Sequence, residues 1–95
     1  MPYAVAQELP GVSVELYHRL IAETGGHTPQ GLILRAVGPH EGNLRMIEVW
    51  ESKEARQHFI RTGIEPARQR LGGAALDEPP HDHFELDVED LVRAD

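Results

Sequence analysis

The segment from Gly31 to Ser52 constrains the fold more than any other part of the chain. Its sequence, GLILRAVGPHEGNLRMIEVWES, predicts a strand over 32–37, a tight polar turn over 38–43 and a returning strand over 44–50. Ser52 then begins a helix, because serine is a favoured N-cap residue. The chain therefore contains a β-hairpin that leads directly into a helix, and such a hairpin dictates how a small sheet is built.

The size and composition indicate one small globular domain. A chain of 95 residues has the length of a single domain, and such a domain buries only about 60–65% of the surface of its unfolded chain. The absence of cysteine excludes disulfides, thiolate catalysis and cysteine-ligated metals. Neither a membrane-spanning apolar run nor a signal peptide is visible, so we expect a cytoplasmic protein without membrane contact.

The negative charge is concentrated at one end of the chain. Residues 1–76 hold eight acidic and eight basic residues, whereas residues 77–95 hold eight acidic residues and one basic residue, Arg93. The net charge of −7 therefore lies in the last segment. Because an acidic surface repels phosphate and no basic patch is present, we expect no nucleic-acid partner.

Hydrophobic spacing predicts the remaining elements. Ser13 caps a helix that Gly25 and Gly26 end. Before the hairpin, the pattern predicts a strand over 3–7 and a helix over 14–23. After it, the pattern predicts a helix from Ser52 that Gly63 breaks or bends, a further turn over 65–71 and a linker over 74–80. A last strand follows, in which Phe84, Leu86 and Val88 alternate with acidic residues.

The order strand, helix, strand, strand, helix, strand predicts an α+β, ferredoxin-like βαββαβ fold with a four-stranded antiparallel sheet. Alternation places Leu32, Leu34 and Ala36 on one face of the first hairpin strand. Along the returning strand, Glu48 lies among apolar residues, opposite the face that carries Ile47. Both sheet faces are largely apolar, and right-handed crossovers put the helices on one of them. We therefore expect a homodimer in which two sheets form a dimeric α+β barrel.

The runs GLILRAVGP and RMIEVWESKEARQHFI resemble small bacterial members of the antibiotic-biosynthesis-monooxygenase-like dimeric α+β barrel superfamily. The resemblance extends over residues 4–92 and is clearest where the strand ends at Trp50. It implies the same fold and a homodimer, and activities such as cofactor-independent monooxygenation, polyketide cyclisation or haem degradation. The superfamily often has a histidine at the position of Arg35, and its monooxygenases use an asparagine and a tryptophan. Trp50 could fill the second role, whereas Asn43 lies in the predicted turn.

The candidate site is the cleft between helices and sheet. A neutral imidazole can accept a proton near pH 7, and aromatic walls suit a planar substrate. The candidate catalytic residues are His18, His58 and Glu48, and the candidate substrate-binding residues are Tyr17, Arg35, Trp50 and Phe59. The competing interpretation of the aromatic residues is packing in the core. For the two histidines, the competing interpretation is a half-exposed position at the boundary of the core. Glu48 is the sharper signal because an unpaired carboxylate would be costly there, and Arg35 can pair with it across the hairpin.

Two classes of function remain open, together with a weaker third. The first is a small cofactor-independent monooxygenase or cyclase for an aromatic or polyketide-like metabolite. The second is a non-catalytic barrel that binds a small hydrophobic ligand. Haem degradation is the third, and it would need His18 or His58 as the axial ligand. The motif His81-Asp82-His83 could bind a metal from one strand face, but no third ligand is evident, so we expect neither a metal nor a cofactor.

Overall fold

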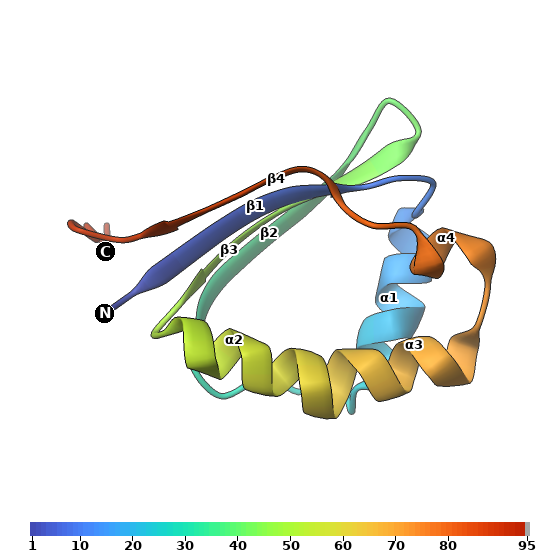
Figure 1. Cartoon of the computed structure of the whole chain (residues 1–95), viewed down its shortest axis with the longest axis horizontal. Helices are drawn as coiled ribbons and strands as arrows, with labels where there is room; N and C mark the ends of the chain where they lie inside the picture. Colours follow the sequence, from blue (N-terminus) through green and yellow to red (C-terminus); the bar gives the residue numbers. More distant parts are fainter. Residues whose placement is uncertain (95) are drawn as a thin grey trace.

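A four-stranded antiparallel sheet carries all the helices on one face (Figure 1). The structure is a computed structural model and describes residues 1–94. Its elements in chain order are β1 (Tyr3–Leu9), α1 (Val14–Glu23), β2 (Leu32–His40), β3 (Asn43–Trp50), α2 (Lys53–Phe59), the π-helical segment η1 (Ile60–Ile64), α3 (Glu65–Leu71), α4 (Ala74–Asp77) and β4 (His81–Asp87).

The sheet has the order β2-β3-β1-β4, and each neighbouring pair is antiparallel. This order places the two central strands β1 and β3 side by side, as the ferredoxin-like arrangement requires. The predicted α+β class and four-stranded antiparallel sheet are therefore confirmed. None of the helices in residues 1–94 has the length and apolarity needed to cross a membrane.

The hairpin turn is shorter than the sequence predicted. Pairing of β2 with β3 continues to His40 and Asn43, so only Glu41 and Gly42 form the turn. Both have positive φ angles, 50° and 81°, and such a turn matches the twist of a tight hairpin. Pro39, predicted to lie in the turn, stays in β2 because an edge strand tolerates a residue without an N–H group.

A β-bulge near the start of β2 changes which residues share a face. Leu32 pairs with Trp50, whereas Leu34 pairs with Val49, so Ile33 is an extra residue between them. Leu32 consequently packs under the helices, against the cluster that contains Trp50. The prediction that Leu32 and Leu34 lie on one face is wrong, because alternation alone does not detect an inserted residue.

Helix α1 forms as its sequence predicts. Ser13 Oγ accepts a hydrogen bond from the backbone N–H of Leu16 at 3.0 Å, and Glu15 lies in the first turn, where the helix dipole favours an anion. The helix ends after Glu23 and buries Tyr17 and Leu20. This orientation directs Tyr17 toward the sheet.

Gly63, predicted to break or bend the second helix, does not break it but lies in a π-helical irregularity. α2, η1 and α3 form one continuous rod, called the long helix below (Figure 1). Within η1, the N–H of Glu65 donates to the carbonyl of Ile60, five residues earlier. This wider turn accommodates Pro66, which has no N–H group and would clash with a regular helix. The π-helical segment η1 therefore accommodates Gly63 and Pro66 without interrupting the helix.

Replacing Gly63 by alanine is expected to destabilise the protein by about 1 kcal/mol. An added Cβ would lie 2.9 Å from the Phe59 ring, and overpacking of about 1–3 kcal/mol outweighs the higher helix propensity of alanine, about 1 kcal/mol. Chemical denaturation followed by the emission of Trp50 measures this change. Gln69→Ala, on an exposed position of α3, is the control, and an equal or higher stability of Gly63→Ala would contradict the tight contact.

The sheet face away from the helices, called the outer face, is largely apolar, and within residues 1–94 no element covers it. The strand register brings together Ala4, Ala6, Leu34, Ala36, Ile47, Val49, Phe84 and Leu86. Four of these side chains are largely exposed: Leu34 at 46%, Ile47 at 54%, Phe84 at 57% and Leu86 at 45%. The alternation predicted for β3, and for Phe84 and Leu86 of β4, is therefore confirmed, whereas Val88 lies beyond the end of β4 at Asp87.

On the helix side the core consists of two clusters. One contains Tyr3, Val5 and Trp50, with Leu32, Ala55 and Phe59 packed against it. The other contains Val12, Tyr17 and Leu44, and Ala75 and Leu76 of α4 are among the residues that pack against it. The segment 74–80, predicted to be a linker, thus includes a helical turn that covers the second cluster. Along β3, Glu48 lies between Leu44 of one cluster and Trp50 of the other.

Candidate functional site

A cavity of about 370 Å³ lies between the sheet and the helices. The sheet contributes mainly Gln7, Arg35, Met46, Glu48 and Trp50, the helices contribute Tyr17, Leu20, Arg56, Phe59 and Ile64, and the segment around α4 contributes Ala75 to Pro80 except Pro79. Apolar surface predominates in the lining, as in most small-molecule sites, and seven of the lining residues are charged. The cavity occupies the space between the two core clusters.

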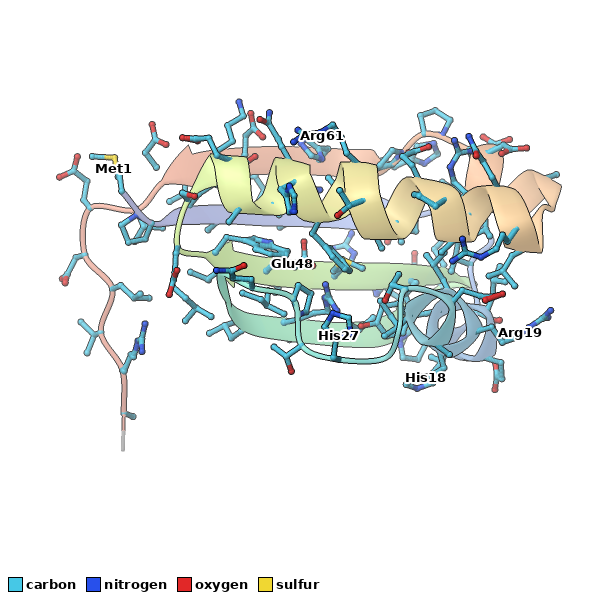
Figure 2. The ribbon with its side chains drawn as sticks, turned by 90° about the horizontal axis from the view of Figure 1, so that it is seen from below. Met1, His18, Arg19, His27, Glu48 and Arg61 are labelled. Carbon is cyan, nitrogen blue, oxygen red and sulfur yellow. The ribbon has the colours of Figure 1, made fainter. Side chains whose placement is uncertain are left out.

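Glu48 is the buried charge at the centre of this site, with 4% of its surface exposed. Arg35 Nε donates to Glu48 Oε2 at 2.7 Å, and Arg56 Nε lies 3.4 Å from Glu48 Oε1. Trp50 Nε1 donates to the same Oε1 at 3.3 Å. The contact expected between Arg35 and Glu48 is therefore confirmed, and Figure 2 shows Glu48 on the sheet beneath the long helix. The carboxylate fixes two arginines and a tryptophan around one point.

Aromatic rings border the charged group. The rings of Trp50 and Phe59 are 5.9 Å apart and tilted by 36°. The guanidinium of Arg35 lies over the Phe59 ring at 5.7 Å, within range of a cation–π interaction. Arg35 Nη1 also donates to the hydroxyl oxygen of Tyr17 at 3.5 Å. The structure thus brings together five residues predicted for the site: Tyr17, Arg35, Glu48, Trp50 and Phe59.

The two histidines predicted for the site do not line the cavity. His18 and His58 are both exposed, and neither belongs to the lining residues. Figure 2 shows His18 on the outer side of α1. The expectation that they converge on the cleft is wrong because the helices rotate Tyr17 and Phe59 inward, which turns the adjacent positions outward. A catalytic role for either histidine has no support from this placement.

Sequence reasoning missed Arg56 and the wall formed by α4. Arg56 precedes Phe59 by three residues and therefore shares its helix face. An arginine on the same helix face as a residue predicted for the site was the available signal. No comparable signal marked Ala75 and Leu76. Their contribution depends on a chain reversal at Gly72 and Gly73, whose positive φ angles of 68° and 105° turn α4 back over the cavity.

The two ends of the cavity differ in charge. Arg35, Glu48 and Arg56 together carry a formal charge of +1. At the α4 end, Arg68 pairs with Glu65 at 2.6 Å and with Asp77 at 2.7 Å, and Glu78 also lines that end. Three acidic residues against one basic residue give that end a formal charge of −2. A ligand inside the cavity therefore meets a cationic and an anionic end.

A second polar group lies beside the site, where central strand β1 pairs with edge strand β4. The Tyr3 hydroxyl donates to Glu85 Oε2, and Lys53 Nζ lies 3.6 Å from Glu85 Oε1. Burial, and then the Glu85 carboxylate, raise the pKa of Tyr3 to about 12. Tyr3 is therefore a protonated hydrogen-bond donor at neutral pH, and it cannot serve as a base there.

The motif His81-Asp82-His83 does not present two histidines on one face. Asp82 has a positive φ of 48°, and the register between β1 and β4 shifts there, with His81 opposite Glu8. His83 Nδ1 instead forms a hydrogen bond of 3.1 Å with Gln7 Oε1. Within residues 1–94, no cluster of three potential metal ligands is found.

No protein-family model matches the chain, and no curated protein matches it. Solved structures do share its architecture. A candidate antibiotic biosynthesis monooxygenase from Chloroflexus aurantiacus has a TM-score of 0.67 at 16% identity, covering 97% of this chain and 98% of that protein. Rv0793 from Mycobacterium tuberculosis has a TM-score of 0.68 at 20% identity, covering 98% and 100%. SnoaB, a cofactor-independent oxygenase from Streptomyces nogalater, has a TM-score of 0.57 at 14% identity, covering 98% and 97%.

The chain has the fold of the antibiotic biosynthesis monooxygenase-like proteins. The three structures match it over nearly their full lengths, so the similarity includes the hairpin, both helical segments and the last strand. The resemblance predicted from the hairpin sequence is confirmed at the level of the fold. Because a fold of this kind can carry different activities, the function has to be argued from the cavity.

Proposed function

We propose that this protein is a cofactor-independent oxygenase that acts on a planar aromatic or polyketide-like metabolite in the cavity between sheet and helices. The observation that carries the proposal is the arrangement around Glu48, in which two arginines and Trp50 converge on a buried carboxylate beside the Phe59 ring. The cavity of about 370 Å³ is within the range of small-molecule sites. The shared fold with SnoaB, a cofactor-independent oxygenase, supports the same reaction class.

The reaction requires a substrate that readily gives up a proton, because an electron-rich anion can react with O₂ directly. In the proposed conversion a CH₂ group next to aromatic rings becomes a carbonyl group. One oxygen atom of O₂ ends in that carbonyl, and the other leaves as water with the two CH₂ hydrogens. The substrate supplies all the electrons. The protein supplies a water-poor aromatic enclosure and, through Arg35 and Arg56, positive charge where the anion forms.

The proposal includes a homodimer. The outer face is the apolar surface that one copy leaves uncovered, and a second sheet packed against it would form a dimeric α+β barrel. Because the cavity lies on the opposite face of the sheet, each protomer would keep its own site. The dimer would stabilise the sheet on which Arg35, Glu48 and Trp50 are placed.

A non-catalytic ligand-binding barrel is the alternative, favoured by the exposed positions of His18 and His58. Without a histidine among the cavity-lining residues, proton removal would depend on the substrate's own acidity. The same placement is unsuitable for haem degradation. No histidine of residues 1–94 lines the cavity, and an axial ligand is what a haem site would need.

Anthrone, a planar tricyclic compound with an acidic CH₂ group, tests the proposal. We expect it to quench the fluorescence of Trp50, which is the only tryptophan, and to be oxidised faster in the presence of the protein, as measured by O₂ uptake. Ile64→Phe, which fills part of the cavity, should reduce both signals. Arg61→Gln, exposed on the long helix and absent from the cavity lining, should leave them unchanged.

The two readouts separate the candidate functions. Quenching without accelerated O₂ uptake would favour the ligand-binding barrel over the oxygenase. The absence of both quenching and O₂ uptake would contradict both candidate functions, because the cavity would then not accept an aromatic ligand of this size.

A further inference from the structure

We infer that the cavity binds its ligand as an anion, with an ionised oxygen held by Arg35 and Arg56. The ligand class is an aromatic acid, phenol or enol whose negative charge lies at one edge of its ring system. This inference rests on the proposed function, because it specifies the substrate class of the same cavity.

The charge balance around Glu48 is the first observation. The side chains of Arg35 and Arg56 are only 12% and 14% exposed, and that of Glu48 is 5% exposed. Two nearly buried guanidinium groups therefore share one carboxylate. A positive charge that is kept away from water is costly unless an anion compensates it. One further negative charge would make the group neutral.

A structural role for Glu48 does not require both arginines. Arg35 alone pairs with the carboxylate at 2.7 Å, and Trp50 donates a further hydrogen bond at 3.3 Å. Arg56 adds a contact of 3.4 Å, which is long for a charge-assisted hydrogen bond. Arg56 also interacts with the Tyr3 hydroxyl, but that neutral group supplies no negative charge. The charge of the second guanidinium is therefore compensated poorly by Glu48 and well by an anionic ligand that reaches Arg56.

The two arginines still have hydrogen-bond donors to offer. Each guanidinium carries five N–H donors. Glu48 accepts from the Nε atom of each, and Tyr17 accepts from Nη1 of Arg35, so other N–H groups of both arginines remain. Among residues 1–94, no side-chain nitrogen or oxygen is both inaccessible and unpaired. Both arginines line the cavity, which places their guanidinium groups next to its interior space. An ionised oxygen in that space can accept from both guanidinium groups.

The opposite end of the cavity determines the orientation of the ligand. Glu65, Asp77 and Glu78 line that end, and Arg68 is engaged by the first two. An anionic group would be repelled there. The ligand's negative edge therefore points to Arg35 and Arg56, and its ring system lies beside Phe59 and Trp50. Neutral or hydroxylated parts of the ligand face α4.

Naphthoate and naphthamide of the same ring isomer form a matched pair of probes, because they have similar shapes and differ in charge at pH 7. Isothermal titration calorimetry of the full chain gives the dissociation constant of each. We expect naphthoate to bind about tenfold or more tightly than naphthamide, since a charge-assisted hydrogen bond is about twice as strong as a neutral one. In Arg56→Gln the preference should fall by about tenfold, with naphthamide affinity unchanged. The control Arg61→Gln should keep the preference.

The wild-type comparison decides the inference even where a variant folds poorly. Equal binding of naphthoate and naphthamide would overturn the anionic ligand and leave the proposed aromatic site in place. Preference for naphthoate together with a failure to oxidise anthrone would support the anionic site and contradict the oxygenase. Binding of neither probe would overturn the inference.

Discussion

Replacing Ile47 by aspartate is expected to convert a homodimer into a monomer. Ile47 is 54% exposed on the outer face and lies between two small residues, Ala6 and Ala36, on the neighbouring strands. It therefore projects as the most exposed apolar side chain of central strand β3 on that face. An unpaired charge buried in an interface costs about 3–5 kcal/mol, and two-fold symmetry would place one in each protomer. Association should weaken by more than about a thousandfold.

Sedimentation velocity at micromolar concentration measures this change. Gln57→Glu adds the same charge on an exposed position of α2, away from the outer face, and it should remain dimeric. Because a monomer with an uncovered apolar face is prone to aggregate or unfold, far-ultraviolet circular dichroism should accompany the measurement. A wild-type protein that sediments as a stable monomer would overturn the dimeric barrel.

Replacing Glu48 by glutamine is expected to destabilise the protein by about 3 kcal/mol. The substitution removes the negative charge between two guanidinium groups that are 12% and 14% exposed, and breaking a buried ion pair typically costs about 3–5 kcal/mol. Urea denaturation provides the free energy of unfolding. Glu54→Gln, an exposed residue of α2, should change stability by less than about 0.5 kcal/mol.

A double-mutant cycle tests whether Arg35 and Glu48 are coupled. In an Arg35→Met background the Glu48→Gln substitution should cost about 1–2 kcal/mol less, because only Arg56 then loses its partner. A remaining cost in that background would be the contribution of Arg56. Additive effects of the two substitutions would show that the 2.7 Å contact between Arg35 and Glu48 contributes no coupling energy.

The local chemistry of the sequence accounts for most of the secondary structure. Ser13 and Ser52 cap their helices as predicted, with hydrogen bonds of 3.0 and 3.1 Å. The alternation in β3 correctly assigns Glu48 to the helix side and Ile47 to the outer face. An error arose at Ile33, where an inserted residue interrupts the simple alternation. At Gly63 the sequence marked an irregularity, but its form, a π-helical segment within a continuous helix, was not predicted.

The sequence by itself determined the order of the elements, the faces of the central strand and the pairing of Arg35 with Glu48. These depend on periods of a few residues and on one tight hairpin turn. Only the tertiary structure decided that Arg56 joins Glu48, that His18 and His58 are exposed, and that α4 closes the cavity. The rotation of each helix about its own axis and the path after Gly72 are set by packing between distant segments, and no local pattern records that packing.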